Sequence, residues 1–322
     1  MAGRRCDPAQ RVGMERRPNV QDFEWNDVRF FLAVAREGTL TGAAQRLRID
    51  HTTVGRRLRI LEETLRAKLF DRSTTGCTLT PQGEKFLEAA EAMESTAISA
   101  QSLIEQADLS MSGTVRIGAT DGFGTFFLAP RLGRLRSEHP LLEVHLLAMP
   151  RVYSLSKREA DIAVGLAQPS EGRLYSRKLT DYQLGVYGSK DYLAQHAPIT
   201  AVSDLTAHAF VSYVDDVMYA KELNYIPRID PAIRPYLKIS NPIAQLKTTA
   251  SGYGLCVLPC FIADFEPNLA RVLADEITLT NSFWLIVHSD QRRLARVRTA
   301  ADFIREEVDL ARNIFLPRHP SS

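Results

Sequence analysis

The sequence has few cysteines, no long apolar run and little net charge. Its 322 residues include 4 cysteines at scattered positions, which is too few for a disulfide scaffold and is typical of a reducing cytoplasm. No apolar run approaches the roughly 20 residues of a membrane-spanning helix, and the N-terminus lacks a secretory signal. We therefore expect a cytoplasmic protein without a membrane partner. The 7 histidines do not cluster, so we expect neither a metal site nor a cofactor.

Hydrophobic residues make up 45% of the chain and charged residues 24%, a composition that excludes disorder of the whole chain. At roughly 150 residues per domain, the length predicts about two domains. The net charge of +2 predicts no partner by itself, but its distribution is more informative. Residues 46–59 carry five arginines against Asp50 alone, whereas residues 81–112 carry six acidic residues against Lys85 alone. A basic block is thus followed by an acidic segment.

The N-terminal part of the chain divides into a polar arm and a helical region. We interpret residues 1–22 as a disordered basic arm, or as sequence upstream of a misplaced start codon, because they show no hydrophobic period. Apolar residues at helical spacing follow from Trp25, and Gly38 predicts the end of the first helix. Residues 69–80 then predict a small β-hairpin with Gly76 at its tip.

Residues 40–65 carry the pattern of a helix-turn-helix, in which a short second helix leads directly into a third. Ala44 supplies the small residue at the helix crossing, and we expect Leu47, Ile49, Val54 and Leu58 to point inward. The alternative is an αα-hairpin with a solvated arginine face. A hairpin wing and a polar outer face favour contact with base edges and phosphates of double-stranded DNA. The residues that we predict to contact DNA are Thr41, His51, Thr52, Thr53, Arg56, Arg57 and Arg72.

Pro81 predicts the start of a long helix, which would span roughly 40 Å. Its apolar positions follow alternating steps of four and three residues, a seven-residue repeat that favours pairing with a second copy in a coiled coil. The alternative is an amphipathic helix that packs on its own domain. The positions in this repeat are Phe86, Ala90, Met93, Ala97, Ala100, Ile104 and Ala107.

After Gly113 the pattern changes to alternating strands and helices, which predicts βαβ units and a parallel sheet. A last amphipathic helix is expected over 294–308. The apolar runs that predict strands are 115–117, 142–147, 161–165, 184–187, 209–213, 237–239, 252–259 and 283–287.

Several segments together resemble the LysR-type transcriptional regulators. The N-terminal segments are highly specific, the C-terminal ones are individually weak, and the resemblance extends from about Trp25 to Val308. The segments are 30–35, 38–44, 58–62, 69–72 and 79–83 in the N-terminal region, and 132–140, 161–164, 252–255 and 258–259 further on.

This resemblance implies a winged helix-turn-helix at 23–81, a coiled-coil linker helix at 82–112 and a two-lobed α/β domain at 113–318 like a periplasmic binding protein. Lobe 1 would comprise about 113–182 and 284–310, and lobe 2 about 183–283. It also implies a homodimer or homotetramer formed through the linker helix, and a small-molecule effector held between the lobes.

One segment departs from the commonest family pattern. Where many relatives begin the recognition helix with Ser-Gln-Pro-Ala-Val-Ser, this chain has Asp-His-Thr-Thr-Val-Gly at 50–55. Gly55 lowers helix stability by roughly 1 kcal/mol relative to alanine, but it lets the backbone approach a base or phosphate closely. The base preference therefore does not carry over from relatives.

The resemblance places the effector beside residues at strand ends and at a helix start, where α/β sheets commonly bind ligands. The alternative for each residue is a loop position that caps a helix. Because Asp121 would repel a carboxylate, we expect a ligand that bears an amine or a hydroxyl, or no ligand. The residues expected to bind the effector are Thr120, Asp121, Gly165, Tyr213, Ser240 and Asn241.

No catalytic constellation is present, so we do not expect an enzyme. The sequence predicts a DNA-binding transcriptional regulator that acts at promoters on the nucleoid and responds to an unidentified small molecule. The alternative is a small-molecule-binding protein without DNA-dependent regulation, for which residues 113–310 alone would suffice.

Overall fold

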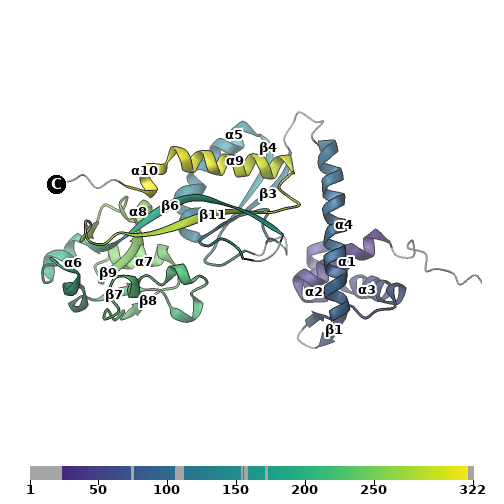
Figure 1. Ribbon diagram of the computed structural model, residues 1–322, viewed down its shortest axis with the longest axis horizontal. Coiled ribbons are helices and arrows are strands. Elements are labelled where there is room, and N and C mark those ends of the chain that lie inside the picture. The colour runs from purple at the N-terminus through teal and green to yellow at the C-terminus, as the bar shows by residue number, and fades with distance from the viewer. Residues whose placement is uncertain are drawn as a thin grey trace, which may run out of the picture. The chain divides into compact units, whose positions relative to one another are not determined.

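The computed structural model describes residues 24–73, 76–105, 112–153, 155, 159–170 and 173–317 (Figure 1). The side chains at 95, 98, 99 and 101–105 lie outside the description, as do Ala107 and the predicted arm 1–22. The chain divides into two compact units with the boundary between Glu94 and Ser95, which is inside the predicted linker helix. No helix in the described part of the chain is long and apolar enough to cross a membrane.

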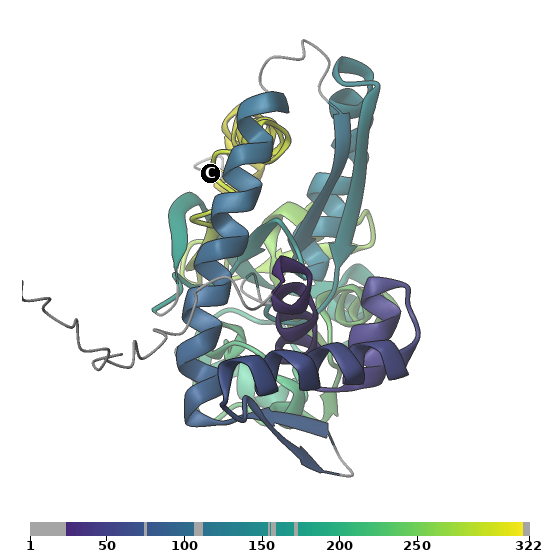
Figure 2. The ribbon, with the colours of Figure 1, turned by 90° about the vertical axis from the view of Figure 1, so that its right-hand side faces the viewer.

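The N-terminal unit contains three short helices, a β-hairpin and the start of a long helix (Figure 2). Gly38 adopts a left-handed φ of 68° and ends the first helix. The Thr39 side chain then accepts a hydrogen bond from the Gly42 amide at 3.0 Å and caps the second helix. The elements are α1 Trp25–Glu37, α2 Leu40–Leu47, α3 His51–Leu65, β1 Phe70–Ser73, β2 Gly76–Leu79 and α4 Pro81–Glu105.

The three helices enclose an apolar core that confirms most of the predicted inward positions. Ala44 is 5% exposed at the crossing, and Val54 and Leu58 are fully buried. The prediction for Ile49 was wrong, because this side chain is 38% exposed. Arg48 before it adopts a left-handed φ of 56° and the Ile49 amide bonds the Ala44 carbonyl at 3.0 Å. This tight turn directs the Ile49 side chain outward.

The hairpin forms as predicted, and it packs against the turn between α1 and α2. Its strands are antiparallel, with Phe70 opposite Leu79. The Cys77 amide donates to the Gly38 carbonyl at 2.7 Å. A Cβ atom at Gly76 would lie 2.6 Å from the same carbonyl oxygen, so the close approach of the two backbones requires glycine there.

The long helix α4 begins at a buried cap and packs its first half on the N-terminal unit. The Gly83 amide donates to the Thr80 hydroxyl at 3.0 Å. The Phe86 ring lies 4.9 Å from that of Phe31 in an edge-on arrangement, and Ala90 is fully buried. Further along the predicted repeat, the side chains of Met93, Ala97 and Ala100 are exposed. The start of the helix therefore packs on its own unit and later apolar side chains are exposed, while pairing with a second copy stays a prediction.

The C-terminal unit is built on one mixed sheet in the order β4-β3-β5-β11-β6-β9-β7-β8, with β10 paired to β6. Strand β3 is parallel to β4 and β5, and β7 is parallel to β8 and β9. The prediction of a parallel sheet was wrong for β6 and β11, which are antiparallel to their neighbours. The strands are β3 Ser112–Ala119, β4 Leu141–Ala148, β5 Ile162–Gly165, β6 Leu174–Ser189, β7 Phe210–Ser212, β8 Leu237–Lys238, β9 Leu255–Pro259, β10 Leu269–Val272 and β11 Leu279–His288.

Strands β6 and β11 run through both halves of this unit, as Figure 1 shows. Residues 284–287 of β11 pair with β5, whereas residues 184–187 of β6 pair with β9. The register between the two long strands shifts between Phe283 and Trp284. We refer to β3, β4 and β5 with the adjoining halves of β6 and β11 as lobe 1, and to β7–β10 with the other halves as lobe 2.

Helices cover the sheet, and an aromatic cluster fills the crossing between the lobes. The Tyr182 and Phe283 rings stack at 4.2 Å, and Phe123 lies 4.8 Å from Phe283. The helices are α5 Leu132–Glu138, α6 Lys190–Gln195, α7 Pro242–Ala250, α8 Cys260–Ala263, α9 Ala295–Leu310 and α10 Arg312–Phe315, with a π-helical turn η1 Phe123–Leu128 and short 3₁₀ turns η2 Ala129–Arg131, η3 Val202–Ala207, η4 Asp215–Val217, η5 Lys221–Leu223 and η6 Ile226–Arg228.

Candidate functional site

Helix α3 presents a polar, basic face to solvent. The side chains of Thr52, Arg56 and Arg59 are exposed, and their spacing of four and three residues places them on one side of the helix. The His51 side chain at the helix start is 64% exposed. Within the described residues, the Arg56 side chain makes no ion pair or hydrogen bond. Its guanidinium is therefore free to meet a phosphate or a guanine edge.

The start of α3 is held by a well-formed cap. The Asp50 carboxylate accepts a hydrogen bond from the Thr52 amide at 2.8 Å and another from the Thr52 hydroxyl. These hydrogen bonds lower the pKa of Asp50. The Thr52 hydroxyl therefore keeps acceptor capacity toward an outside partner, while its proton is engaged.

Arg57 differs from Arg56 because it joins α3 to α1. Its Nη1 atom lies 3.3 Å from Asp27 Oδ1 and 3.2 Å from Glu24 Oε2. Asp27 is only 2% exposed, so the guanidinium neutralises a carboxylate that water reaches poorly. Arg57 therefore braces the recognition helix, and its predicted contact with DNA stays a prediction.

Arg72 on β1 also has a carboxylate partner. Its Nη2 atom lies 3.2 Å from Glu62 Oε2. The other oxygen of Glu62 accepts hydrogen bonds from the amides of Leu69 and Phe70 at 2.9 and 3.2 Å. Glu62 thus fastens the hairpin to α3 and holds Arg72 beside this helix. Of the remaining predicted residues, Thr41 is exposed on α2 and Thr53 is half-buried.

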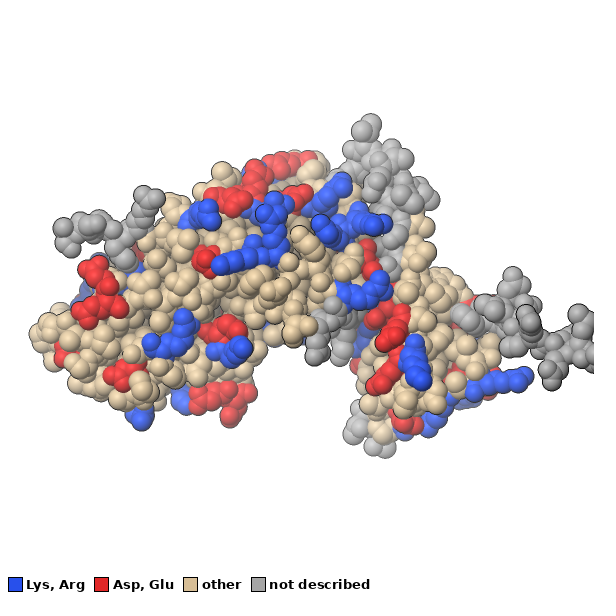
Figure 3. All heavy atoms as spheres, viewed as in Figure 1, with Lys and Arg blue, Asp and Glu red and all other residues tan. Residues whose placement is uncertain are grey.

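The charge on the N-terminal unit is unevenly distributed. Basic side chains line its lower right edge in Figure 3, and acidic side chains follow α4. One acidic residue of α4, Glu94, forms a bidentate ion pair, in which the Arg36 guanidinium donates to both carboxylate oxygens at 3.1 and 2.5 Å. The basic edge suits a polyanion, whereas the acidic helix does not.

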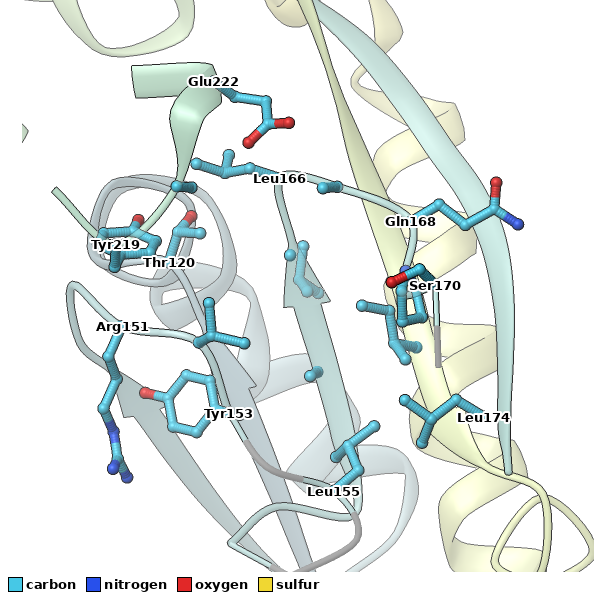
Figure 4. Close-up of a pocket in the computed structure, with 18 of the residues that line it drawn as sticks. Thr120, Arg151, Tyr153, Leu155, Leu166, Gln168, Ser170, Leu174, Tyr219 and Glu222 are labelled. Carbon is cyan, nitrogen blue, oxygen red and sulfur yellow. The ribbon is translucent and has the colours of Figure 1, made fainter. Parts of the chain in front are cut away.

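The C-terminal unit contains a cavity of about 310 Å³ at the carboxyl ends of the parallel strands of lobe 1 (Figure 4). Thr120 follows β3, Arg151 and Tyr153 follow β4, and Gly165 ends β5. Tyr219 and its neighbours from lobe 2 complete the lining. Thr120 and Gly165 therefore lie where the sequence predicted, in a mostly apolar cavity between the lobes.

A second, smaller cavity of about 20 Å³ adjoins the first. It contains two further predicted residues, Asp121 at the end of β3 and Tyr213 at the end of β7, together with Tyr182 and Tyr225. Thr120, Leu166 and Tyr219 line both cavities. The two cavities therefore share part of their walls, and we refer to them together as the cleft.

Electrostatics distinguish the smaller cavity. Asp121 is 5% exposed, and its Oδ2 atom has no hydrogen-bond partner in the described part of the chain. Burial raises the pKa of Asp121, and the backbone amides of Gly122 and Asp121 partly offset this rise. Burial, with a contribution from the negative charge of Asp121, also raises the pKa values of Tyr213 and Tyr219. Both tyrosines therefore carry neutral hydroxyls at physiological pH.

Ser240 and Asn241 lie elsewhere. Ser240 is exposed, and the Asn241 side chain accepts a hydrogen bond from the Ala244 amide at 2.9 Å and caps α7. Neither residue lines either cavity. Asn241 therefore caps a helix, which is the alternative that the sequence left open for it. The following residue, Pro242, reaches the smaller cavity instead.

Sequence reasoning missed the loop residues Arg151, Tyr153 and Tyr219. The Arg151 guanidinium lies 5.0 Å from the centre of the Tyr153 ring and 3.7 Å from Glu159. Figure 4 shows Arg151 and Tyr153 on the side of the cavity opposite Glu222. One pattern in the sequence could have indicated Tyr219, because tyrosines recur every six residues at 213, 219 and 225.

Comparisons with known proteins support both units. The profile of the bacterial regulatory helix-turn-helix protein, lysR family, matches residues 25–84, and the LysR substrate binding domain matches residues 110–309. The HTH-type transcriptional regulator CrgA of Neisseria meningitidis serogroup C is 24% identical over 287 residues, or 86% of this chain and 95% of CrgA. PtxR of Pseudomonas aeruginosa is 26% identical over 291 residues, or 88% of this chain and 92% of PtxR.

Solved structures have the same fold. The CrgA structure superimposes with a TM-score of 0.56 at 23% identity, covering 88% of this chain and 98% of that one. A full-length OxyR from Pseudomonas aeruginosa reaches a TM-score of 0.63 at 18% identity, with the same coverage of both chains. A helix-turn-helix domain followed by a two-lobed substrate-binding domain is thus the shared architecture. This chain belongs to the LysR family of DNA-binding transcriptional regulators.

Proposed function

We propose that α3 lies in the major groove of promoter DNA, with the hairpin beside it as a wing. His51, Thr52 and Thr53 at the helix start would face base edges, and Arg56 would contact a phosphate or guanine. The observation that carries this proposal is the exposed face of α3, where Arg56 has no carboxylate partner within the described residues. Thr41 and Arg72 flank this face. Arg57 keeps donors that its two carboxylates do not use, so it also contributes to holding the phosphate backbone.

The test is a gel-shift titration on the intergenic DNA next to the protein's own gene. We expect Arg56→Ala to weaken binding and to reduce its salt dependence by about one phosphate contact. Arg136→Ala, an exposed arginine on α5 in the other unit, is the matched control and should bind like the wild type. Equal binding by both variants would contradict the role of Arg56.

We also propose that two copies associate along α4, as a homodimer or as a pair of such dimers. Support comes from Met93, Ala97 and Ala100, exposed apolar side chains spaced four and three residues apart, which is the period of a coiled-coil seam. Pairing would present two α3 helices to a roughly palindromic site. Light scattering should show that Ala97→Asp shifts the protein toward the monomer, whereas Glu88→Asp on the same helix should leave the assembly unchanged.

The cleft is the proposed effector site. Its residues come from both lobes, so a bound molecule would favour one relative arrangement of them and alter the regulator's state. Thr120 and Gly165 would contact the effector in the larger cavity, and Asp121 and Tyr213 in the smaller one. Ser240 and Asn241 lie beside α7, which carries Pro242 to the cleft. A thermal-shift screen of small molecules, repeated with a cleft variant, tests this assignment.

A further inference from the structure

We propose that the effector is an organic cation, with its ammonium group beside Asp121 among the tyrosines and its apolar body in the larger cavity. This inference rests on the proposed effector cleft and specifies the chemistry that the cleft takes. Its starting point is the carboxylate of Asp121, which is 5% exposed and has an oxygen without a hydrogen-bond partner among the residues that the structure describes. Buried polar groups are nearly always paired, so an unpaired carboxylate oxygen facing a cavity indicates a missing donor.

Among the described residues, none supplies that donor. The described lining of the smaller cavity contains no lysine, arginine or histidine, and Asp121 is the one charged residue in it. Its other polar groups are chiefly the hydroxyls of Thr120, Tyr213 and Tyr219. A buried carboxylate without a counter-ion is costly unless it becomes protonated or meets a cation. A positively charged ligand would remove that cost, and a negatively charged one would add to it.

The tyrosines around Asp121 suit a cation as well. Tyr182, Tyr213, Tyr219 and Tyr225 all line the smaller cavity, and the negative faces of aromatic rings attract ammonium groups. The Tyr182 ring stacks on that of Phe283 at 4.2 Å, and the Tyr213 and Tyr225 rings meet edge-on at 6.1 Å, which holds this wall in place. A carboxylate with several aromatic rings is a combination that proteins use to recognise amines.

The volumes indicate how such a ligand would sit. The smaller cavity, at about 20 Å³, admits one water-sized group, which an ammonium resembles. The larger cavity offers about 310 Å³ and is lined by apolar residues such as Leu155, Val164 and Ile286. Since Tyr219 lines both spaces, a short chain passing this residue would connect the two groups. The predicted ligand is therefore amphipathic, with one amine and a compact apolar body.

The basic groups in the described lining of the cleft do not offset this preference. They are Arg151 and Lys221, and both line only the larger cavity. Arg151 lies over the Tyr153 ring and near Glu159, and Lys221 is followed by Glu222 in the same lining. A carboxylate ligand held by Arg151 would occupy the larger cavity and leave the Asp121 oxygen unpaired.

Calorimetry with the full chain tests the proposal through three probes of similar size: phenethylamine, 2-phenylethanol and phenylacetate. We expect phenethylamine to bind most tightly, and Asp121→Asn to weaken it at least about tenfold without weakening 2-phenylethanol. Tyr219→Leu should weaken the amine more than Tyr219→Phe does, because only phenylalanine keeps the aromatic face. Asp216→Asn, an exposed aspartate of lobe 2, is the control and should bind like the wild type.

Three results would overturn the inference: tighter binding of phenylacetate, unchanged amine binding in Asp121→Asn, or no amine binding at millimolar concentration. A gel shift on the same preparations separates this failure from failure of the proposed function. Intact DNA binding without amine binding would reject only the proposal that the ligand is a cation. Loss of both would also reject the proposed function, a DNA-binding regulator with an effector site in the cleft. Circular dichroism shows which variants are folded. If Asp121→Asn does not fold, the comparison of Tyr219→Leu with Tyr219→Phe tests the role of the aromatic rings in amine binding.

Discussion

Replacing Asp121 by asparagine removes a charge from a buried site and keeps the shape of the side chain. In most proteins a loss of this kind destabilises the fold, but here the Oδ2 atom has no partner to lose among the described residues. We expect Asp121→Asn to raise the free energy of unfolding at neutral pH by about 1 kcal/mol, the lower end of the cost of an unsatisfied buried polar group. The neutral amide of asparagine also lacks hydrogen-bond partners at this position. The rise in the free energy of unfolding therefore stays at the lower end of that range.

The pH dependence of this gain follows from the direction of the pKa shift. Burial raises the pKa of Asp121 above its ordinary value of 3.8. Between the ordinary value and the raised one, the folded wild type binds more protons than the unfolded chain, so its stability falls as the pH rises. The asparagine variant has no such term. Its advantage over the wild type should therefore be absent below the ordinary aspartate pKa and complete above the raised one.

Thermal unfolding of ligand-free protein at a series of pH values measures this difference. For a unit of about 200 residues, 1 kcal/mol corresponds to a rise of about 2–4 °C in Tm. Asp216→Asn, an exposed aspartate, should match the wild type throughout. If Asp121→Asn lowers Tm at neutral pH, or if its effect is the same at every pH, the carboxylate is making a stabilising contact within the protein and the reasoning fails.

Three further predictions concern the N-terminal unit. Gly83→Ala should destabilise it by about 2 kcal/mol or more, because the added Cβ would lie 2.1 Å from the Leu69 carbonyl oxygen; an unchanged Tm would contradict this. Gly55→Ala should stabilise α3 by about 0.5–1 kcal/mol, since its Cβ would meet only Leu40 at an ordinary 3.7 Å. A loss of DNA affinity in that stable variant would show that the bare backbone approaches DNA. Arg57→Ala should lower stability by about 1–2 kcal/mol by leaving Asp27 without its counter-ion, whereas Arg56→Ala should leave Tm unchanged; equal Tm values for both variants would refute the bracing role.

Several features of the DNA-binding unit were readable from local sequence. Gly38 after α1 and the helical spacing of the apolar residues act within a few residues, so the helices of this unit could be predicted. The exposed face of α3 followed from the helical period. Ile49 was mispredicted because periodicity does not extend through a turn with a left-handed residue. The partner of Arg57 was also beyond reach, because Asp27 is 30 residues away in sequence.

The effector unit was less predictable. The strands β6 and β11 were predicted too short, because the first half of β6 alternates between exposed and partly buried residues and lacks a continuous apolar run. Their antiparallel pairing joins segments about a hundred residues apart, and no local signal encodes it. Tyr219 and Arg151 were missed for the same reason, since each lies in a loop whose direction depends on the packing of a whole lobe.

Short-range chemistry in the chain alone determined the helix-turn-helix, the basic face of α3 and the presence of a carboxylate after β3, because capping, periodicity and charge act between near neighbours. Only the folded structure decided that Arg57 neutralises Asp27 and that α4 packs its start on its own unit and exposes apolar side chains beyond. It also decided that one oxygen of Asp121 has no hydrogen-bond partner within the described residues and lies among tyrosines from the opposite lobe. Those outcomes depend on which distant surfaces meet and exclude water, and burial of that kind is a property of the tertiary arrangement.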